Sequence, residues 1–285
     1  MRELGNWRPR HAVIFHYDDE NPKREALHAE ILATLKAAHT PTQELAFTEW
    51  SAVESLRENM KRLGEILGRH GRNPIVLDIS VFTRRHLLML LRWLDDSGYW
   101  DQLAVVYTEP EDYDVSEFIP LSFGLQSLEQ IPGFPACPDL SRPVHLVLFL
   151  GFEGDRALAV YEHVEPMQTT LFLTDPPYNP DWRGRAEDLN KDLLTLVKHD
   201  DLVRVDGIDP ERSTIALTKV FGDKHNRSEF AKIVCSIGTK PQSFGIYCYV
   251  RDCDDPPAVV YASPLRHNHM FFSHGIGKSW ILRLP

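Results

Sequence analysis

The chain lacks several features that define common protein classes. Its 285 residues include four cysteines but no Cys-x-x-Cys pair, so we expect neither a zinc knuckle nor a thioredoxin-type dithiol. The longest apolar runs, such as residues 144–152, are far shorter than the roughly 20 residues of a membrane span. Residues 1–10 are polar and show no apolar signal segment. We therefore expect a cytoplasmic protein that does not bind membranes.

Basic residues are also in deficit. The sequence has 31 lysines and arginines against 41 aspartates and glutamates, which gives a formal net charge of −10. An acidic surface repels phosphate backbones, so we expect no bulk nucleic-acid binding, although a local basic pocket could hold a small anion. The 43% hydrophobic and 25% charged content is typical of a globular chain with a packed core.

Two catalytic motifs are missing, and a histidine cluster is weak as a metal site. The sequence contains neither the GxxxxGK[ST] phosphate-binding loop nor the GxSxG nucleophile elbow. His267, His269 and His274 lie close together in the chain, but a metal site needs more ligands in fixed geometry, so we interpret them as part of a polar loop. A general-base role for one of them stays open. We expect no bound metal and no cofactor.

What the sequence does contain is a repeated alternation of apolar strand-like runs and amphipathic helices. In the first half, strands are predicted at residues 11–16, 44–47, 75–79 and 103–107, with helices at 22–38, 51–69 and 83–95. In the second half, strands are predicted at residues 144–151, 169–174, 202–205, 230–237, 258–262 and 279–284. Helices are predicted there at 155–163, 183–197 and 210–222, and residues 241–250 could form a helix or a strand.

This alternation predicts an α/β protein made of two Rossmann-like halves, with mainly parallel sheets and helices on both faces. The first half spans residues 1–115 and the second half 144–285. Residues 116–143 are rich in proline and predict an irregular connector.

Ligands of open parallel sheets bind at the carboxyl ends of the strands, so the residues that follow each strand are the candidates. Gly238, Thr239, Lys240, Gln242 and Ser243 follow the strand at 230–237. A glycine that allows close backbone approach, a hydroxyl, an ammonium and further hydrogen-bonding groups suit a phosphate or a nucleotide. The alternative is a tight turn with a surface lysine.

A second candidate loop follows the strand at 144–151. Gly151 and Glu153 open the next predicted helix, and Arg156 lies on its first turn. Backbone amides and a guanidinium at that point would attract an anion. The alternative is an ordinary strand-to-helix turn with Arg156 in solvent.

A third candidate group lies at the end of the strand at 75–79. Asp78 stands within an apolar run, so we expect a buried carboxylate with Ser80, Thr83 or Arg84 as its partner. The alternative is that Asp78 caps the following helix.

The tetrapeptide Asp175-Pro176-Pro177-Tyr178 follows the strand at 169–174. It is identical to the catalytic motif of amino-group DNA methyltransferases, in which Asp175 would accept a hydrogen bond from the target amine and Tyr178 would stack on a flipped base. The glycine-containing turn at 149–154 is only about twenty residues away, and the acidic charge suits a DNA enzyme poorly. We therefore rank this function low.

The second half resembles the CRISPR-associated Rossmann-fold (CARF) sensor domains. The resemblance is carried by a strand, then Gly238-Thr239-Lys240-Pro241-Gln242, then an apolar stretch, then the run VVYASP at 259–264. It implies that Gly238, Thr239 and Lys240 contact a cyclic oligonucleotide, commonly across a dimer. Two such halves in one chain are similar to the SAVED arrangement of bacterial anti-phage signalling, although the first half has no Gly-Thr-Lys.

The expected function is therefore a nucleotide-sensing regulatory protein of prokaryotic antiviral defence, rather than an enzyme. Lys240 and Arg156 would neutralise phosphate, and Thr239, Ser243 and the amides of Gly238 and Gly151 would complete the site. No nuclease, helix-turn-helix or membrane effector is recognisable, so the output would lie in a partner protein, in cleavage of the ligand by the protein itself, or in an activity of the first half. We expect a protein partner or a homodimer. The alternatives are a nucleotide-processing enzyme on the same fold and a scaffold subunit of a defence complex.

Overall fold

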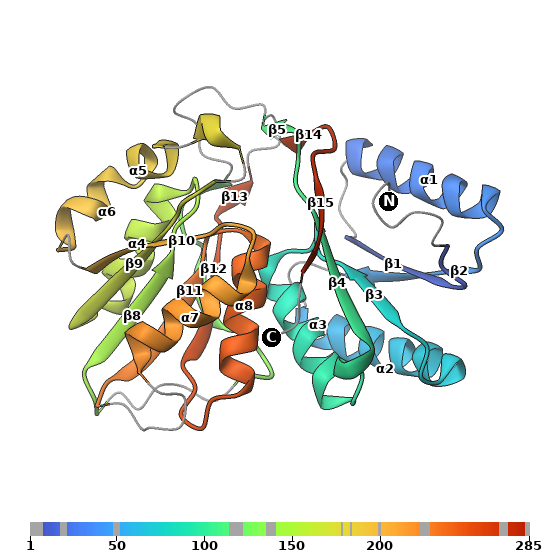
Figure 1. The fold of residues 1–285 in the computed structure, drawn as a ribbon, viewed down its shortest axis with the longest axis horizontal. Coiled ribbons are helices and arrows are strands. Elements are labelled where there is room, and N and C mark those ends of the chain that lie inside the picture. Colours follow the sequence, from blue (N-terminus) through green and yellow to red (C-terminus); the bar gives the residue numbers. More distant parts are fainter. Residues whose placement is uncertain are drawn as a thin grey trace. The chain divides into compact units, whose positions relative to one another are not determined.

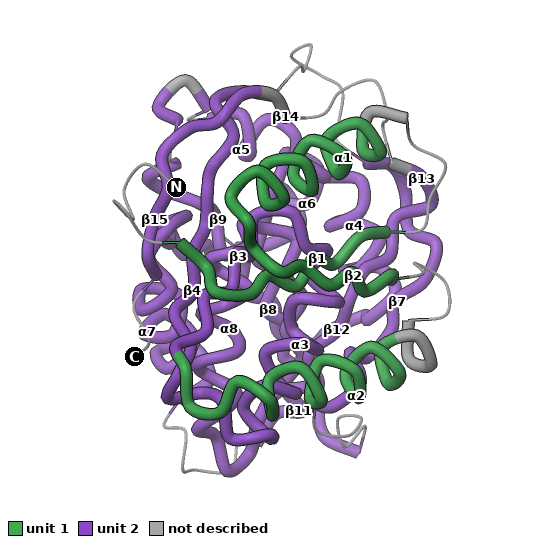
Figure 2. Tube along the Cα trace, turned by 90° about the vertical axis from the view of Figure 1, so that its right-hand side faces the viewer, with its two compact units in different colours: residues 1–73 green, residues 74–285 purple. Residues whose placement is uncertain are grey.

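The chain is described by a computed structural model, which covers residues 8–17, 22–47, 52–113, 122–134, 141–177, 179–182, 184–198, 201–222, 229–267 and 273–282. It divides into two compact units, Met1–Asn73 and Pro74–Pro285 (Figure 2). Ser51, the first residue of the helix predicted at 51–69, lies outside the described residues, as do the loop residue His269 and Tyr178.

Unit 1 is a pair of parallel strands with a helix on either side (Figure 2). β1 (Ala12–Tyr17) pairs with β2 (Thr42–Phe47), and Ile14 lies opposite Glu44. Leu45 and Phe47 point to one face, where they are fully buried and packed by α2 (Ala52–His70). Helix α1 (Pro22–Ala37) contacts β2 from the other face. Its less exposed positions recur with helical spacing at Arg24, His28, Leu32 and Leu35.

Unit 2 is built on a six-stranded sheet with the order β10-β9-β8-β11-β12-β7 (Figure 1). The parallel strands are β8 (Val144–Phe149), β9 (Gln168–Thr174), β10 (Leu202–Val205), β11 (Ala231–Ser236) and β12 (Ala258–Ser263). β7 (Ser127–Gln130) pairs antiparallel with β12 at one edge. The chain winds outward from β8 to β10 and then restarts at β11 beside β8. The direction of winding therefore reverses between β8 and β11.

Helices cover both faces of this sheet, and the prediction of an α/β fold with largely parallel sheets is confirmed. Contacts with β8 and β9 place α4 (Gly154–Val164) and α5 (Arg185–Leu189) on one face, with α6 (Lys191–Leu196) against α4. α7 (Pro210–Phe221) packs along α8 (Lys240–Arg251) on the other. Along each strand, successive side chains point alternately toward these two helix layers, because a strand has a period of two residues. Leu146 and Leu148 join the core under α4, whereas Val147 and Phe149 point to the α8 side.

A second, three-stranded sheet of unit 2 has the order β15-β4-β3. Its strands are β3 (Ile75–Asp78), β4 (Leu103–Thr108) and β15 (Ser279–Leu282), and β15 runs antiparallel to β4. Two short pairs complete the described strands: β5 (Asp112–Tyr113) with β14 (Ser273–His274), and β6 (Ser122–Phe123) with β13 (Arg266–His267).

Helix α3 (Arg84–Asp96) is attached to α8 by a polar and aromatic contact. Tyr247 Oη donates a 2.7 Å hydrogen bond to Asp95 Oδ2, and Arg251 Nε donates one of 2.8 Å to the same oxygen. Burial, with this hydrogen bond, raises the pKa of Tyr247, so the phenol stays a donor. The Arg251 guanidinium also lies over the Trp100 ring, 4.7 Å from its centre. These contacts hold the carboxyl-terminal end of α3 against the carboxyl-terminal end of α8.

Several element predictions are corrected by the structure. The compact units separate after Asn73, not at the predicted 116–143 connector, and part of that connector forms β7 in the main sheet. The strand predicted at 279–284 does not join the six-stranded sheet with the other strands of the second half. It forms β15, which pairs with β4 in the three-stranded sheet. The helix predicted at 183–197 is interrupted at Asn190, whose side-chain amide donates to the carbonyls of Gly151 and Ala186. Residues 241–250, left as helix or strand, are helical.

Candidate functional site

A cavity of about 90 Å³ lies at the carboxyl ends of β8, β9 and β11. Open α/β sheets bind ligands where the strand order reverses, because the adjacent loops there turn away from each other. That point in this sheet lies between β8 and β11. The lining comprises residues 150–153 after β8, Thr174 and Pro177 after β9, residues 237–240 after β11, and Arg84, Tyr107, Trp182 and Ala186.

A larger cavity, of about 320 Å³, lies beside α4 and α6. Its charged lining residues are Asp155 and Asp192. A wall whose charges are both negative disfavours an anionic ligand. The smaller cavity, which contains the predicted Gly-Thr-Lys loop, is therefore the better candidate.

The Gly-Thr-Lys loop is held in place by its own side chains. Thr239 is the N-cap of α8: its Oγ1 accepts from Gln242 N at 3.2 Å, while Gln242 Oε1 accepts from Thr239 N at 2.9 Å. Thr239 Oγ1 also donates to the carbonyl of Gly207 at 2.6 Å. Ser243 Oγ lies 2.8 Å from Ser236 Oγ. This reciprocal capping box satisfies two amides that a helix start otherwise leaves free.

Gln242 and Ser243 were predicted as ligand-binding residues, and the structure gives them a different role. Both are fully buried, and neither lines the cavity. Gln242 Nε2 donates to Thr174 Oγ1 at 3.1 Å, which ties the loop to the end of β9. Their side chains therefore determine the shape of the loop and do not face a ligand.

Two glycines allow the two loops to approach each other closely. A Cβ atom on Gly151 would overlap the carbonyl oxygen of Ile237 and would lie 2.7 Å from Glu153 Oε2. A Cβ atom on Gly238 would overlap Gln242 Oε1, the acceptor of the capping box. Any larger residue at either position would push the end of β11 away from the end of β8 or break the cap.

Lys240 differs from the other residues of the loop because its side chain takes no part in the contacts that hold the loop together. It is the first residue of α8, it lines the cavity, and its ammonium makes no hydrogen bond or ion pair with any residue that the structure describes. Burial and, as a smaller cause, the nearby Arg84 charge lower the pKa of Lys240 to about 8, while Asp78 and Glu153 act in the opposite direction. A desolvated cation without a partner favours an incoming anion.

Arg84, one of the predicted site residues, comes from α3 and lines the same cavity. Its Nε donates to the carbonyl of Gly238 at 3.0 Å, and its Nη2 donates to the carbonyls of Ile237 and Gly238. Arg84 therefore both clamps the end of β11 and adds a positive charge beside Lys240. The Nη1 nitrogen makes no hydrogen bond within the described part of the chain.

Arg156 does not contribute its charge to the cavity. Its side chain is 5% exposed, and its Nη2 pairs with Glu153 Oε1 at 3.2 Å. Glu153 lines the cavity, whereas Arg156 is not among the residues that line it. The prediction that Arg156 neutralises a ligand phosphate is therefore replaced by a role in neutralising Glu153.

Asp78 is exposed, so the prediction of a buried carboxylate is wrong. The capping alternative is also wrong, because Thr83 caps α3 through a bond from His86 N to Thr83 Oγ1. Asp78 Oδ1 accepts from Ser80 N at 2.9 Å, and Ser80 Oγ accepts from Thr108 N at 2.8 Å. These hydrogen bonds link the end of β3 to the end of β4. Neither Asp78 nor Ser80 lines the cavity.

The Asp175-Pro176-Pro177 segment contributes Pro177 to the cavity. The Asp175 carboxylate is ion-paired with Arg204, with 3.1 Å between Oδ2 and Nη1. Arg204 in turn bonds Glu187 at 2.6 Å, and these two carboxylates raise the pKa of the guanidinium. An Asp175 held in this way does not face the cavity as an acceptor for a target amine.

Three aromatic residues of the cavity were missed by sequence reasoning. Tyr107 comes from β4, Phe152 from the loop after β8, and Trp182 from a short 3-10 helix. The Phe152 and Trp182 rings meet edge to face, 5.6 Å between centres. These rings form an apolar wall next to the cationic groups. Their spacing along the chain carries no period that would have marked them.

No protein-family model, curated protein or solved structure matches this chain in the comparisons with known proteins. Among the described residues, none of the helices combines the length and the apolar character needed to cross a membrane.

Proposed function

We propose that the cavity at the β8–β11 switch point binds the phosphate of a nucleotide-type ligand, and that the protein is a sensor of that ligand. The observation that carries the proposal is Lys240: an ammonium at the start of a 12-residue helix, desolvated and without a described partner. Helix N-termini attract anions because the helix dipole is positive there. The capping box occupies the amides of Thr239 and Gln242, so at this helix the dipole and the Lys240 ammonium provide the attraction.

The local charge supports an anion despite the acidic chain. Among the described residues that line the cavity, Arg84 and Lys240 carry positive charge, and the one carboxylate, Glu153, is paired with Arg156. A small positive cavity in a protein of net charge −10 selects a compact anion and does not attract a polyanion.

The size of the cavity supports a group about as large as one phosphate. Pockets that enclose a drug-sized ligand measure roughly 300–1,000 Å³. A cavity of about 90 Å³ takes only part of such a ligand. In this arrangement the phosphate lies against Lys240 and the rest of the ligand extends past Phe152 and Trp182. Aromatic rings suit that part because they stack on nucleobases.

The resemblance of residues 238–242 to the CARF loop gives the first ligand class to test, the cyclic oligonucleotides. It also supports a role in prokaryotic antiviral defence, with the output in a partner protein or in a second copy of this chain. These steps of the proposal depend on the resemblance, whereas the phosphate site depends on the cavity.

The proposal is tested by calorimetry on the full-length protein against cyclic oligoadenylates, cyclic dinucleotides, ATP and inorganic phosphate. Fluorescence gives a second readout, because Trp182 lines the cavity. The expected result is saturable binding of at least one nucleotide, lost in Lys240→Met and kept in Lys219→Met. Lys219 is an exposed lysine of α7 and serves as the matched control. Lack of binding across the panel, or equal binding by Lys240→Met, would overturn the proposal.

A nucleotide-processing activity is a second candidate, favoured by the lowered pKa of Lys240. A lysine with a pKa of about 8 is partly neutral near neutral pH, so it can act as a general base. Incubation of the same nucleotides with the protein, followed by chromatography, separates the two functions. Ligand recovered intact supports a sensor, and cleavage that is lost in Lys240→Met supports an enzyme.

A further inference from the structure

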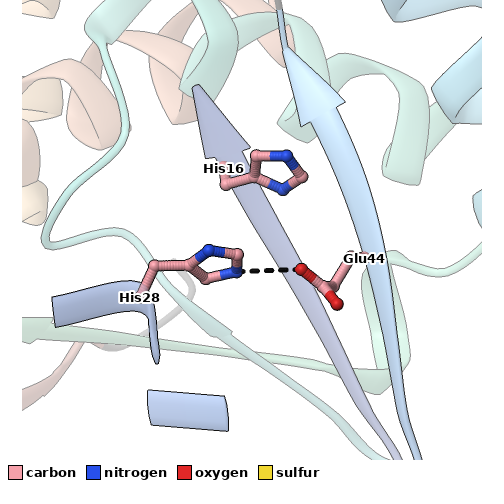
Figure 3. Close-up of side chains that lie close together, drawn as sticks. All are labelled: His16, His28 and Glu44. Carbon is pink, nitrogen blue, oxygen red and sulfur yellow. Dashed lines mark ion pairs between the residues drawn. The ribbon is translucent and has the colours of Figure 1, made fainter. Parts of the chain in front are cut away.

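Unit 1 contains a cluster of three side chains that no part of the proposed function uses. His16, His28 and Glu44 each offer one ligand atom, and these atoms all lie within 4.8 Å of one another (Figure 3). The His28 Nε2 atom lies 3.1 Å from Glu44 Oε2. The His16 and His28 rings are stacked, with 4.9 Å between their centres. The cluster lies wholly within unit 1.

The backbone of unit 1 brings these residues together. In the parallel pair of β1 and β2, Ile14 lies opposite Glu44, and His16 lies opposite Ala46. Residues two apart on a strand share a face, so His16 and Glu44 project to the same side. His28 reaches that side from α1, on the same helical stripe as Leu32. Three consecutive elements, β1, α1 and β2, therefore converge on one point.

The cluster is partly open to solvent and partly buried. The His28 and Glu44 side chains are 24% and 44% exposed, so a small ion could enter from solvent. The His16 Nδ1 atom is buried and has no hydrogen-bond partner within the described residues. A buried nitrogen without a hydrogen-bond partner is destabilising, so a partner at this position would be stabilising.

The ion pair between His28 and Glu44 involves only one of the two histidines. The second imidazole brings a further nitrogen to within 4.8 Å of the other two ligand atoms, so the three side chains together offer a set of metal donors.

We propose that His16, His28 and Glu44 bind a divalent transition-metal ion, and that Zn²⁺ is the ion that best fits this donor set. Two imidazoles and one carboxylate are a typical zinc set that leaves a fourth position open for water or a small ligand. Mg²⁺ and Ca²⁺ prefer oxygen-only sites, so the two nitrogens disfavour them. The proposal is independent of the phosphate site and is tested separately from it.

The test is a metal titration of the full-length protein, without an affinity tag, after EDTA treatment and dialysis. CoCl₂ is added first, because tetrahedral Co²⁺ has visible d–d bands, and ZnCl₂ is then used to displace it. The expected result is one Co²⁺ bound per chain with no cobalt–thiolate band, and its displacement by Zn²⁺ but not by MgCl₂ or CaCl₂.

Two ligand variants and two controls locate the ion. His28→Gln and Glu44→Gln change partly exposed side chains, so folding is expected to survive, as circular dichroism would verify. Each should weaken Co²⁺ binding by more than about a hundredfold, beyond the 10–100-fold effect of losing an outer-shell partner. His163→Gln on α4 and Glu30→Gln on α1 change exposed side chains and should bind Co²⁺ as the parent does. Absence of stoichiometric binding, binding unchanged in both ligand variants, or a thiolate band would overturn the assignment.

Discussion

Replacing Lys240 with methionine is expected to make the ligand-free protein more stable. Burial lowers the pKa of Lys240 from 10.5 to about 8, which means that the folded protein disfavours the charged ammonium. At about 1.4 kcal/mol per pKa unit, this shift corresponds to an upper limit of roughly 3 kcal/mol at pH 7. The side chain is only half-buried, so solvent screening reduces the expected gain below this limit, to about 1–2 kcal/mol.

The pH dependence of this gain has a defined sign. Between pH 8 and pH 10.5 the unfolded chain binds more protons at Lys240 than the folded chain does. The stability of the parent protein at this residue therefore rises with pH across that window. The penalty is complete below pH 8, so the difference between Lys240→Met and the parent should be largest at pH 7 and vanish near pH 10.5.

Urea unfolding at pH 7 and pH 10, followed by tryptophan fluorescence, measures this difference. A ligand at 100 times its Kd adds about 2.7 kcal/mol to the parent, and the Lys240→Met variant should show none of this increase. Lys219→Met removes the same charge from the surface and should stay within about 0.5 kcal/mol of the parent. If Lys240→Met were less stable than the parent at pH 7, the desolvated lysine would not be the strained group that the argument requires.

Two further predictions concern the sheet that supports the site. Burial lowers the pKa of His145 to about 4, and its Nε2 lies 2.9 Å from Thr170 Oγ1, so the folded state contains neutral imidazole. Because the unfolded pKa is 6.5, the stabilisation is complete above that pH and is lost as the pH falls toward 4; between pH 7 and pH 5, the free energy of unfolding of His145→Gln should therefore fall by about 2 kcal/mol less than that of the parent. Gly151→Ala should lower the free energy of unfolding by about 1–3 kcal/mol and weaken nucleotide binding, because its Cβ meets the Ile237 carbonyl. Gly68→Ala, where a Cβ meets nothing within 4 Å, should instead be neutral or stabilising in the same urea titration, and equal losses in the two variants would contradict the steric argument.

The sheet of unit 2 was predictable because its strands are short apolar runs separated by helices with period 3.6. Such runs define β8, β9 and β11. Because ligands bind at the carboxyl ends of such strands, the sequence alone indicates the loop at 238–240 as a candidate site. The same local reasoning could not find β7. Residues 127–130 carry no apolar run, and they form a strand because the edge of β12 offers unpaired backbone groups.

Side-chain partners were less predictable, because they depend on which loops meet. Arg156 was expected in the cavity, yet its nearest charge is Glu153, one helical turn away. Asp78 was expected to be buried because its neighbours in the strand are apolar, but the strand ends there and the carboxylate is exposed. The His16–Glu44 proximity depends on the register of β1 with β2, and no short motif records a register.

The Gly-Thr-Lys loop shows how a short motif divides its residues between structure and binding. Gly238 makes room for the cap, Thr239 forms it, and Gln242 closes it, so these residues would be needed even in a loop that bound nothing. Lys240 is different, because its charge satisfies no group of the described structure and is desolvated where it lies. A residue that destabilises the free protein while its neighbours hold it in position is the part of the motif that binding explains and folding does not.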